Sequence, residues 1–133
     1  MKDPRGRRSL TNVGGKVERF GNPETSLKVA HALDVKSSLA EEEPSRVHVH
    51  GFHAYPARMH PTTAARLVHA FSPENGTILD PFCGSGTVLV EALLLGRNTF
   101  GSDLNPLAVE LAMTKTSSLT KEDGDLLITT AWE

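Results

Sequence analysis

The feature that most constrains the fold is a glycine-containing loop between a predicted strand and a predicted helix. A short β-favouring run, residues 77–79, ends at Asp80, and a helix is predicted over about residues 87–95. Gly84 and Gly86 stand between them. Glycines there let the backbone pass close to a ligand, and the helix start leaves amide donors free for a polar group. The segment therefore predicts a ligand-binding loop in an α/β fold.

The elements around the loop follow in the order of a doubly wound sheet. A helix is predicted after Pro61, and a second strand over about residues 98–102. Asn105 can cap a further helix that has Pro106 at its first position. Strand, loop, helix, strand and helix in this order predict an incomplete three-layer α/β fold, of which the chain holds the first β-α-β-α units.

Residues 1–45 differ in texture from the rest of the chain. They mix Gly, Pro, Ser, Lys and Glu without sustained periodicity, and six basic residues against two acidic ones stand in the first twenty. We expect a polar, disordered segment there, with at most a short helix over about residues 27–39. The basic head is read as a solvated tail, with contact to phosphates as the alternative. A partial ligand-binding domain is expected over residues 46–133.

Cysteine and histidine usage limits the kinds of site that the chain can hold. The single cysteine excludes an intramolecular disulfide and a multi-cysteine zinc site. Four histidines crowd together without a cluster of carboxylates or cysteines, which favours solvated or pocket-lining side chains over zinc ligands. They are His48, His50, His53 and His60. Neither a signal peptide nor an apolar run near the ~18 residues of a membrane helix is found, so we expect a cytoplasmic chain.

The loop matches neither of two common phosphate-binding fingerprints. No Lys-Ser or Lys-Thr pair follows Gly86, and the third glycine of the dinucleotide fingerprint is missing. A bound triphosphate or pyrophosphate is therefore not expected. Asp103, 17 residues beyond Gly86, stands at the end of the second predicted strand. An acidic side chain there accepts hydrogen bonds from ribose hydroxyls in Rossmann-like folds, and helix capping is the alternative role.

The loop closely resembles the first motif of S-adenosylmethionine-dependent methyltransferases of the amino-group type. Its residues are Asp80, Pro81, Phe82, Cys83, Gly84, Ser85, Gly86 and Thr87. In that family an acidic residue and the glycine loop hold the amino acid end of the cofactor, and the fold is Rossmann-like. The resemblance also covers the turn that follows the second strand. It implies that Asp103 binds the ribose, that Leu104 packs on the adenine ring, and that Asn105 belongs to the same cofactor site.

A second segment, residues 52–61, looks like the tenth motif of the same enzymes. In the family this segment lines the methionine end of the cofactor pocket. The resemblance therefore makes His53, Tyr55 and Arg58 candidate cofactor-binding residues. A proline-rich turn that enters a helix is the alternative interpretation. The resemblance as a whole covers about residues 47–116 and says nothing of the rest.

The catalytic motif of these enzymes is not found in the sequence. In the family an Asp, Ser or Asn followed by Pro-Pro and an aromatic residue accepts the amine hydrogens and stacks on the flipped base. No Pro-Pro pair occurs here. Cys83 lies inside the cofactor loop and is expected to fill space rather than to attack a base. A truncated reading frame, one half of a split enzyme and a binding-only relative all fit this departure.

The resemblance thus implies the cofactor-binding part of a DNA methyltransferase that acts on an exocyclic amine of adenine or cytosine, as in restriction-modification. We expect S-adenosylmethionine as cofactor and DNA as a partner through the missing half. A complementary chain or self-association is expected to complete the domain. No catalytic residue and no metal ligand are expected in this chain. An RNA guanine amine methyltransferase and a non-catalytic partner subunit are the alternatives.

Overall fold

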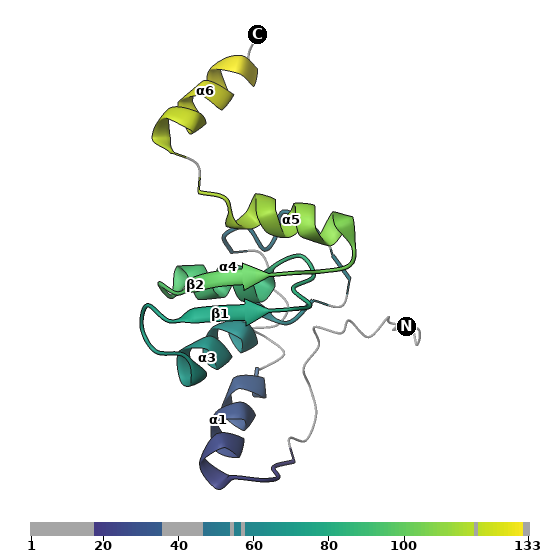
Figure 1. The fold of residues 1–133 in the computed structure, drawn as a ribbon, viewed down its shortest axis with the longest axis vertical. Coiled ribbons are helices and arrows are strands. Elements are labelled where there is room, and N and C mark those ends of the chain that lie inside the picture. Colours follow the sequence, from purple (N-terminus) through teal and green to yellow (C-terminus); the bar gives the residue numbers. More distant parts are fainter. Residues whose placement is uncertain (1–17, 36–46, 54, 57, 119, 132–133) are drawn as a thin grey trace, which may run out of the picture.

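The computed structural model describes residues 18–35, 47–53, 55–56, 58–118 and 120–131. Five of its elements match the order and type predicted from the sequence. In chain order the elements are α1 (Pro23–Leu33), α3 (Pro61–Phe71), β1 (Thr77–Asp80), α4 (Thr87–Leu94), β2 (Asn98–Gly101), α5 (Pro106–Thr116) and α6 (Lys121–Ala131) (Figure 1). The predictions from α3 to α5 are confirmed, because each expected helix and strand is present.

The two strands form a parallel sheet in which Leu79 pairs with Phe100. Parallel neighbours need a crossover connection, and α4 supplies it. Gly96, with a φ of 73°, ends this helix because its amide donates to the carbonyl of Leu93 in a left-handed cap. The chain then returns directly into β2, so both strands end at the same edge of the sheet.

One helix, α4, organises the packing of the described elements. It packs against both strands, while α3 and α5 flank it and α1 packs against α3 (Figure 1). The buried apolar residues of these four helices are mostly small or branched: Ala32, Ala64, Val68, Leu89, Val90, Ala92, Ala108, Leu111 and Ala112. The core therefore lies between the helices and on one face of the sheet.

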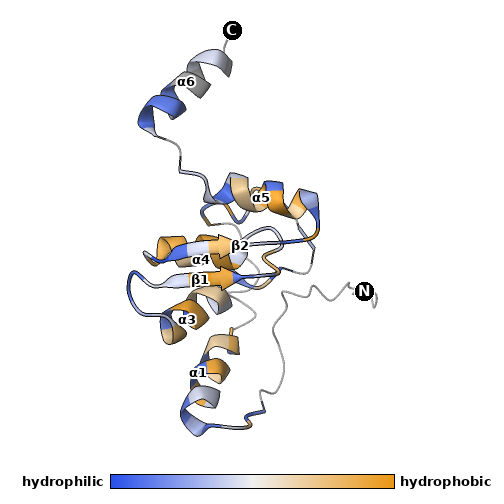
Figure 2. Cartoon of the chain, viewed as in Figure 1, coloured by the Kyte–Doolittle hydropathy of each residue, from blue (hydrophilic) through white to orange (hydrophobic). Residues whose placement is uncertain are grey.

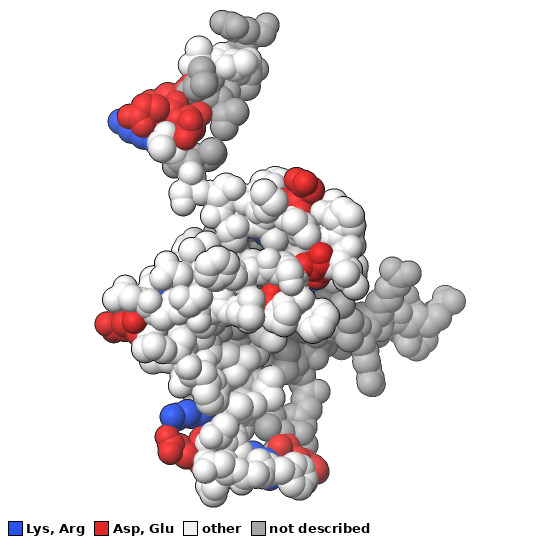
Figure 3. All heavy atoms as spheres, in the orientation of Figure 1, with Lys and Arg blue, Asp and Glu red and all other residues white. Residues whose placement is uncertain are grey.

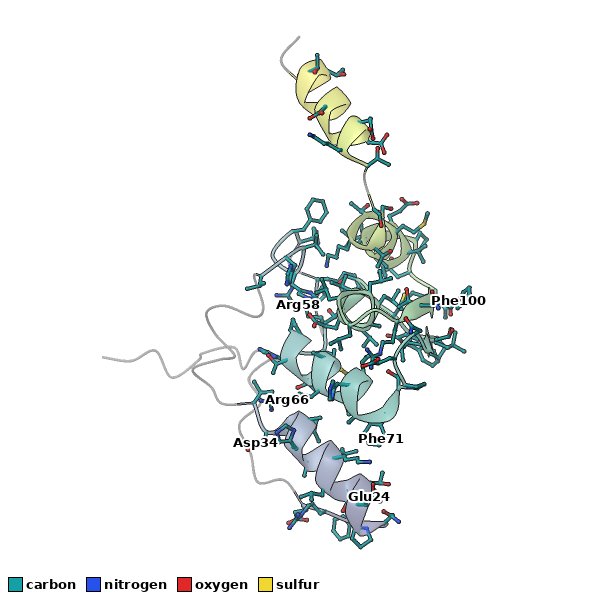
Figure 4. The ribbon with its side chains drawn as sticks, turned by 90° about the vertical axis from the view of Figure 1, so that its left-hand side faces the viewer. Glu24, Asp34, Arg58, Arg66, Phe71 and Phe100 are labelled. Carbon is teal, nitrogen blue, oxygen red and sulfur yellow. The ribbon has the colours of Figure 1, made fainter. Side chains whose placement is uncertain are left out.

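The other face of the sheet is left uncovered by the described part of the chain. Leu79 and Phe100, which are paired across the two strands, are 70% and 66% exposed. Figure 2 shows apolar residues within both strands, and Figure 4 shows Phe100 pointing away from the helices. The described residues thus form two of the layers expected for a three-layer fold.

Helix α1 lies within residues 1–45, for which a disordered segment with at most a short helix was expected. It begins four residues before the expected start at residue 27 and overlaps the expected range of 27–39. Asn22 caps it by accepting two backbone hydrogen bonds from the first turn, and Pro23 takes the first helical position. Because the segment is rich in polar residues, the sequence interpretation did not use these local signals for a helix start. Residues 1–17, with most of the basic head, lie outside the described residues.

The far end of α1 is fixed by packing against α3. Arg66 of α3 donates to the carbonyls of His31 and Asp34, each over 2.9 Å (Figure 4). Ala32 and Val35 are fully or almost fully buried at the same contact. Backbone carbonyls at a helix end need such partners because no further turn follows to satisfy them. The contact makes α1 part of the helical layer.

The last element, α6, stands apart from the other helices in Figure 1. The end of the chain is helical from Lys121. Thr120 and Asp123 cap each other at its start, with the Thr120 hydroxyl donating to the Asp123 carboxylate over 2.7 Å. Figure 3 shows the acidic surface of this first turn. In the part of the chain that is described, no helix has the length and apolarity to span a membrane.

Candidate functional site

A pocket of about 230 Å³ lies where the loop after β1 faces the irregular segment before α3. Both predicted ligand-binding segments therefore contribute to one site. The lining residues are Tyr55, Arg58, Met59, Asp80, Phe82, Cys83, Gly84, Ser85, Thr87 and Val88. Two of them, Met59 and Val88, were not predicted, although each follows directly on a predicted residue. The remaining predicted residues lie outside this lining.

Six predicted residues do not line the pocket: His53, Pro81, Gly86, Asp103, Leu104 and Asn105. His53 is exposed, and Pro81 is exposed with its carbonyl accepting a hydrogen bond from the Ser102 hydroxyl. Gly86 has a φ of 81°, and a Cβ at this position would lie 3.0 Å from the Cβ of Ala112 on α5. Gly86 therefore allows α5 to pack against the start of α4, which is a different role from facing a ligand.

Asp103 ties the glycine loop to the end of β2. One carboxylate oxygen accepts from the amide of Asn105 and the other from the amide of Gly84, each over 2.9 Å. Both bonds lower the pKa of Asp103 below its ordinary value, and the bond from Asn105 has the larger effect. A carboxylate has about four acceptor sites, so roughly two remain for hydroxyl groups of a ligand. Asp103 thus holds the loop and still has capacity to bind.

Asn105 connects the turn after β2 to the opposite wall of the pocket. Its Oδ1 caps α5 by accepting from the amide of Leu107, and its Nδ2 donates to the hydroxyl of Tyr55 over 3.2 Å. A Cβ at Gly84, where φ is 50°, would lie 3.5 Å from the Tyr55 ring. Leu104, one residue earlier than Asn105, is 97% exposed. The exposed apolar side chain of Leu104 therefore lies in a turn whose conformation is fixed by hydrogen bonds.

The pocket contains polar groups that have no protein partner. The Ser85 and Thr87 hydroxyls are buried and make no hydrogen bond within the described residues. Gly86, at the N-cap of α4, provides no side-chain bond to the first helical amides. Buried polar groups are rarely left unpaired, so these favour a polar ligand. The partial positive charge of the helix start favours a carboxylate.

Acidic and basic groups both act on the loop. The pKa of the Cys83 thiol is raised mainly by burial, and the negative charges of Asp80 and Asp103 raise it further. Figure 3 shows acidic atoms at the surface where the two strands end. Arg58 supplies positive charge from the segment before α3. Lys115 is buried near it, and the pKa of Lys115 is lowered mainly by burial and also by the charge of Arg58. The pocket lining thus includes one acidic and one basic side chain, Asp80 and Arg58.

Cys83 fills space under the loop, as the sequence predicted. It is buried in a cluster with Leu89 and Ala112, and its Cβ and Sγ lie close against Gly101. Because its pKa is raised, the thiol stays protonated near neutral pH and is a poor nucleophile. The described residues include no group of three metal-ligating side chains arranged to hold an ion.

Comparison with known proteins places the chain in a family. Residues 20–114 match the model of the DNA methylases, the N6/N4 methyltransferases. The chain belongs to the DNA methylase family. The match begins just before α1 and ends within α5, so it extends into the segment that the sequence interpretation set apart as residues 1–45. No solved structure matches the chain.

Curated relatives include enzymes that act on DNA and on RNA. The chain is 41% identical over 73 residues to the type II methyltransferase M.MvaI of Kocuria varians, covering 53% of the chain. It is 33% identical over 82 residues to M.MjaII of Methanocaldococcus jannaschii, covering 62%. It is 42% identical over 57 residues to a tRNA (guanine(10)-N2)-dimethyltransferase of Methanothermobacter thermautotrophicus, covering 42%. The matches make up 16%, 16% and 17% of these relatives, so the chain spans about a sixth of their length.

Proposed function

We propose that the chain binds S-adenosylmethionine in this pocket and forms the cofactor-binding part of an enzyme that methylates an exocyclic amine of adenine or cytosine in DNA. The observation that carries the proposal is the loop itself. Asp103 holds Gly84, and the unpartnered hydroxyls of Ser85 and Thr87 line the pocket beside it. Family membership and the type II relatives support DNA as the substrate class.

The chemistry of the pocket and of the turn after β2 fits each part of this cofactor. The carboxylate of its amino acid end suits the start of α4 and the nearby Arg58. The ribose hydroxyls suit the free acceptor sites of Asp103, and the adenine ring suits the exposed Leu104. When bound, the cofactor supplies a methyl group on a positively charged sulfonium. The residues of this chain hold and orient it.

The target amine needs a group that orients its lone pair toward the methyl. The chain has no Pro-Pro pair with which the family does this. We propose that a complementary chain supplies that group, and that it covers the open sheet face around Leu79 and Phe100. Self-association through the same face would also shield this apolar surface from water.

Calorimetric titration tests the proposed cofactor site. The chain is expected to bind S-adenosylmethionine and its demethylated product at one site. Incubated with labelled cofactor and mixed-sequence DNA, the pure chain is expected to transfer only background label, because its sequence has no Pro-Pro motif to orient the amine. Failure to bind at millimolar cofactor would contradict the site. Cofactor-dependent base methylation by the pure chain would contradict the need for a complementary part.

A second test addresses the open sheet face. The chain is expected to self-associate in a concentration-dependent way, because Leu79 and Phe100 expose apolar surface on a sheet that has only two strands in the described part of the chain. The double variant Leu79→Thr and Phe100→Thr keeps β-favouring residues and should sediment as a monomer with unchanged cofactor affinity. Leu27→Ser, at an exposed leucine of α1, serves as the control. A parent chain that sediments as a monomer at all concentrations would refute this expectation.

The tRNA-modifying relative favours a second candidate function, methylation of a guanine amine in RNA. Both functions use the same cofactor pocket and differ in the nucleic acid that accepts the methyl group. A labelled-cofactor assay with duplex DNA and with tRNA, run on the chain together with its complementary half, separates them. Transfer to neither acceptor, with cofactor bound, would indicate a non-catalytic subunit.

A further inference from the structure

His50 is a buried side chain that neither predicted cofactor-binding segment uses. Its side chain is 1% exposed, and its Nε2 lies 2.7 Å from Oε1 of Glu91, which is 13% exposed. A carboxylate only accepts hydrogen bonds, so the Nε2 carries the proton and donates. Burying either group without the other is unfavourable. The pair therefore joins two segments that lie 41 residues apart in the chain.

Glu91 belongs to the helix that follows the cofactor loop. It stands one turn after Thr87, and residues four apart share a face of a helix. Thr87 lines the cofactor pocket. His50, by contrast, lies in a segment of turns before α3, where His48 has a φ of 53°. Such a segment has no helix or strand ladder to fix its position, so side-chain anchors decide where it lies.

The anchor continues to the pocket through the backbone of His50. Its carbonyl accepts a hydrogen bond from the guanidinium of Arg58, which lines the pocket and lies on the helical side of the molecule in Figure 4. Further along the segment, Tyr55 is held by Asn105. The wall of the pocket thus has one anchor on α4, at Glu91, and another at the start of α5.

We propose that His50 and Glu91 are positioning residues for the cofactor pocket. They fix the wall that carries Tyr55 and Arg58, and they do so without contacting the ligand. This inference rests on the proposed cofactor binding. A wall that is fixed in advance loses less conformational entropy when the ligand binds. Breaking the pair is therefore expected to weaken S-adenosylmethionine binding about tenfold.

The experiment compares variants of the full chain by calorimetry and by backbone hydrogen exchange. His50→Asn and Glu91→Ala should speed exchange in the segment 47–60 while α3 and α4 stay protected, and both should weaken cofactor binding. Glu91→Gln keeps an acceptor for the Nε2 proton and should restore most of both properties. His69→Asn and Glu110→Ala, at exposed positions on α3 and α5, should match the parent.

Thermal melting of the same variants separates positioning from a purely structural role. Lower melting temperatures with unchanged exchange in the segment 47–60 and unchanged cofactor affinity would overturn the inference. If the parent chain does not bind S-adenosylmethionine, the proposed function fails. The exchange of the ligand-free variants still decides whether the pair holds the pocket wall, so the two failures are distinguishable.

Discussion

Gly86→Val is expected to abolish S-adenosylmethionine binding and to lower the free energy of unfolding by about 2–5 kcal/mol. The φ of 81° at Gly86 is unfavourable for any residue with a Cβ, and most of all for a branched one. The new Cβ would also lie 3.0 Å from the Cβ of buried Ala112 and 3.1 Å from its Cα. Because a backbone atom cannot move aside alone, either α5 or the cofactor loop must shift.

Gly96→Ala is the control that separates the two causes. Gly96 has a φ of 73°, and a Cβ there meets nothing within 4 Å. It should cost about 1–2 kcal/mol for the backbone conformation alone and leave cofactor binding intact. Gly86→Ala should cost more, because it adds the contact with α5. Urea unfolding and calorimetry measure both effects. Equal destabilisation by the two alanines would mean that the close approach to α5 is unimportant.

Asp103→Ala is expected to weaken S-adenosylmethionine binding about ten- to hundredfold. The change removes the acceptor proposed for the ribose hydroxyls and also releases the amides of Gly84 and Asn105. Asp103→Asn keeps one acceptor oxygen and should fall between the parent and the alanine variant. Asp34→Ala, at an exposed aspartate after α1, should bind like the parent. Parent-like affinity of Asp103→Ala would remove Asp103 from the site.

The lowered pKa of Asp103 predicts part of the loss of folding stability in acid. The amides of Asn105 and Gly84 lower its pKa in the folded state, so folding favours the ionised carboxylate. This contribution to stability is present above the ordinary aspartate pKa of about 4, and it is lost as the pH falls through the lowered value. Denaturant unfolding at a series of pH values below about 4 should show a shallower acid dependence for Asp103→Asn. The same dependence in both proteins would contradict this assignment.

Local signals explain why most elements could be predicted from the sequence. Both α3 and α5 begin with a proline at the first helical position, and Gly96 ends α4. Helix α1 carries a comparable signal in Asn22 and Pro23, but the first apolar residue after Pro23 is Leu27, so the predicted start was too late. Its stability comes from packing against α3, which the sequence of the segment does not reveal.

The site was predictable only as far as its signals are local. Glycines and an acid at a fixed spacing indicate the loop, whatever surrounds it. The contacts that close the pocket depend on how α4 and α5 pack. Tyr55 and Asn105 are 50 residues apart, and His50 and Glu91 are 41 apart. In the sequence His50 is grouped with neighbouring histidines that lack a carboxylate, whereas its partner stands on a helix far along the chain.

The central position of α4 has a consequence for the order in which the chain folds. Its contacts with α3, both strands and α5 join elements that are near neighbours along the chain. Such contacts close short loops and form early, whereas the bonds of the pocket wall close much longer ones. We therefore expect the layer around α4 to form in the folding transition state and the pocket wall to close after it. A cofactor that binds only the closed wall then slows unfolding and leaves the folding rate unchanged.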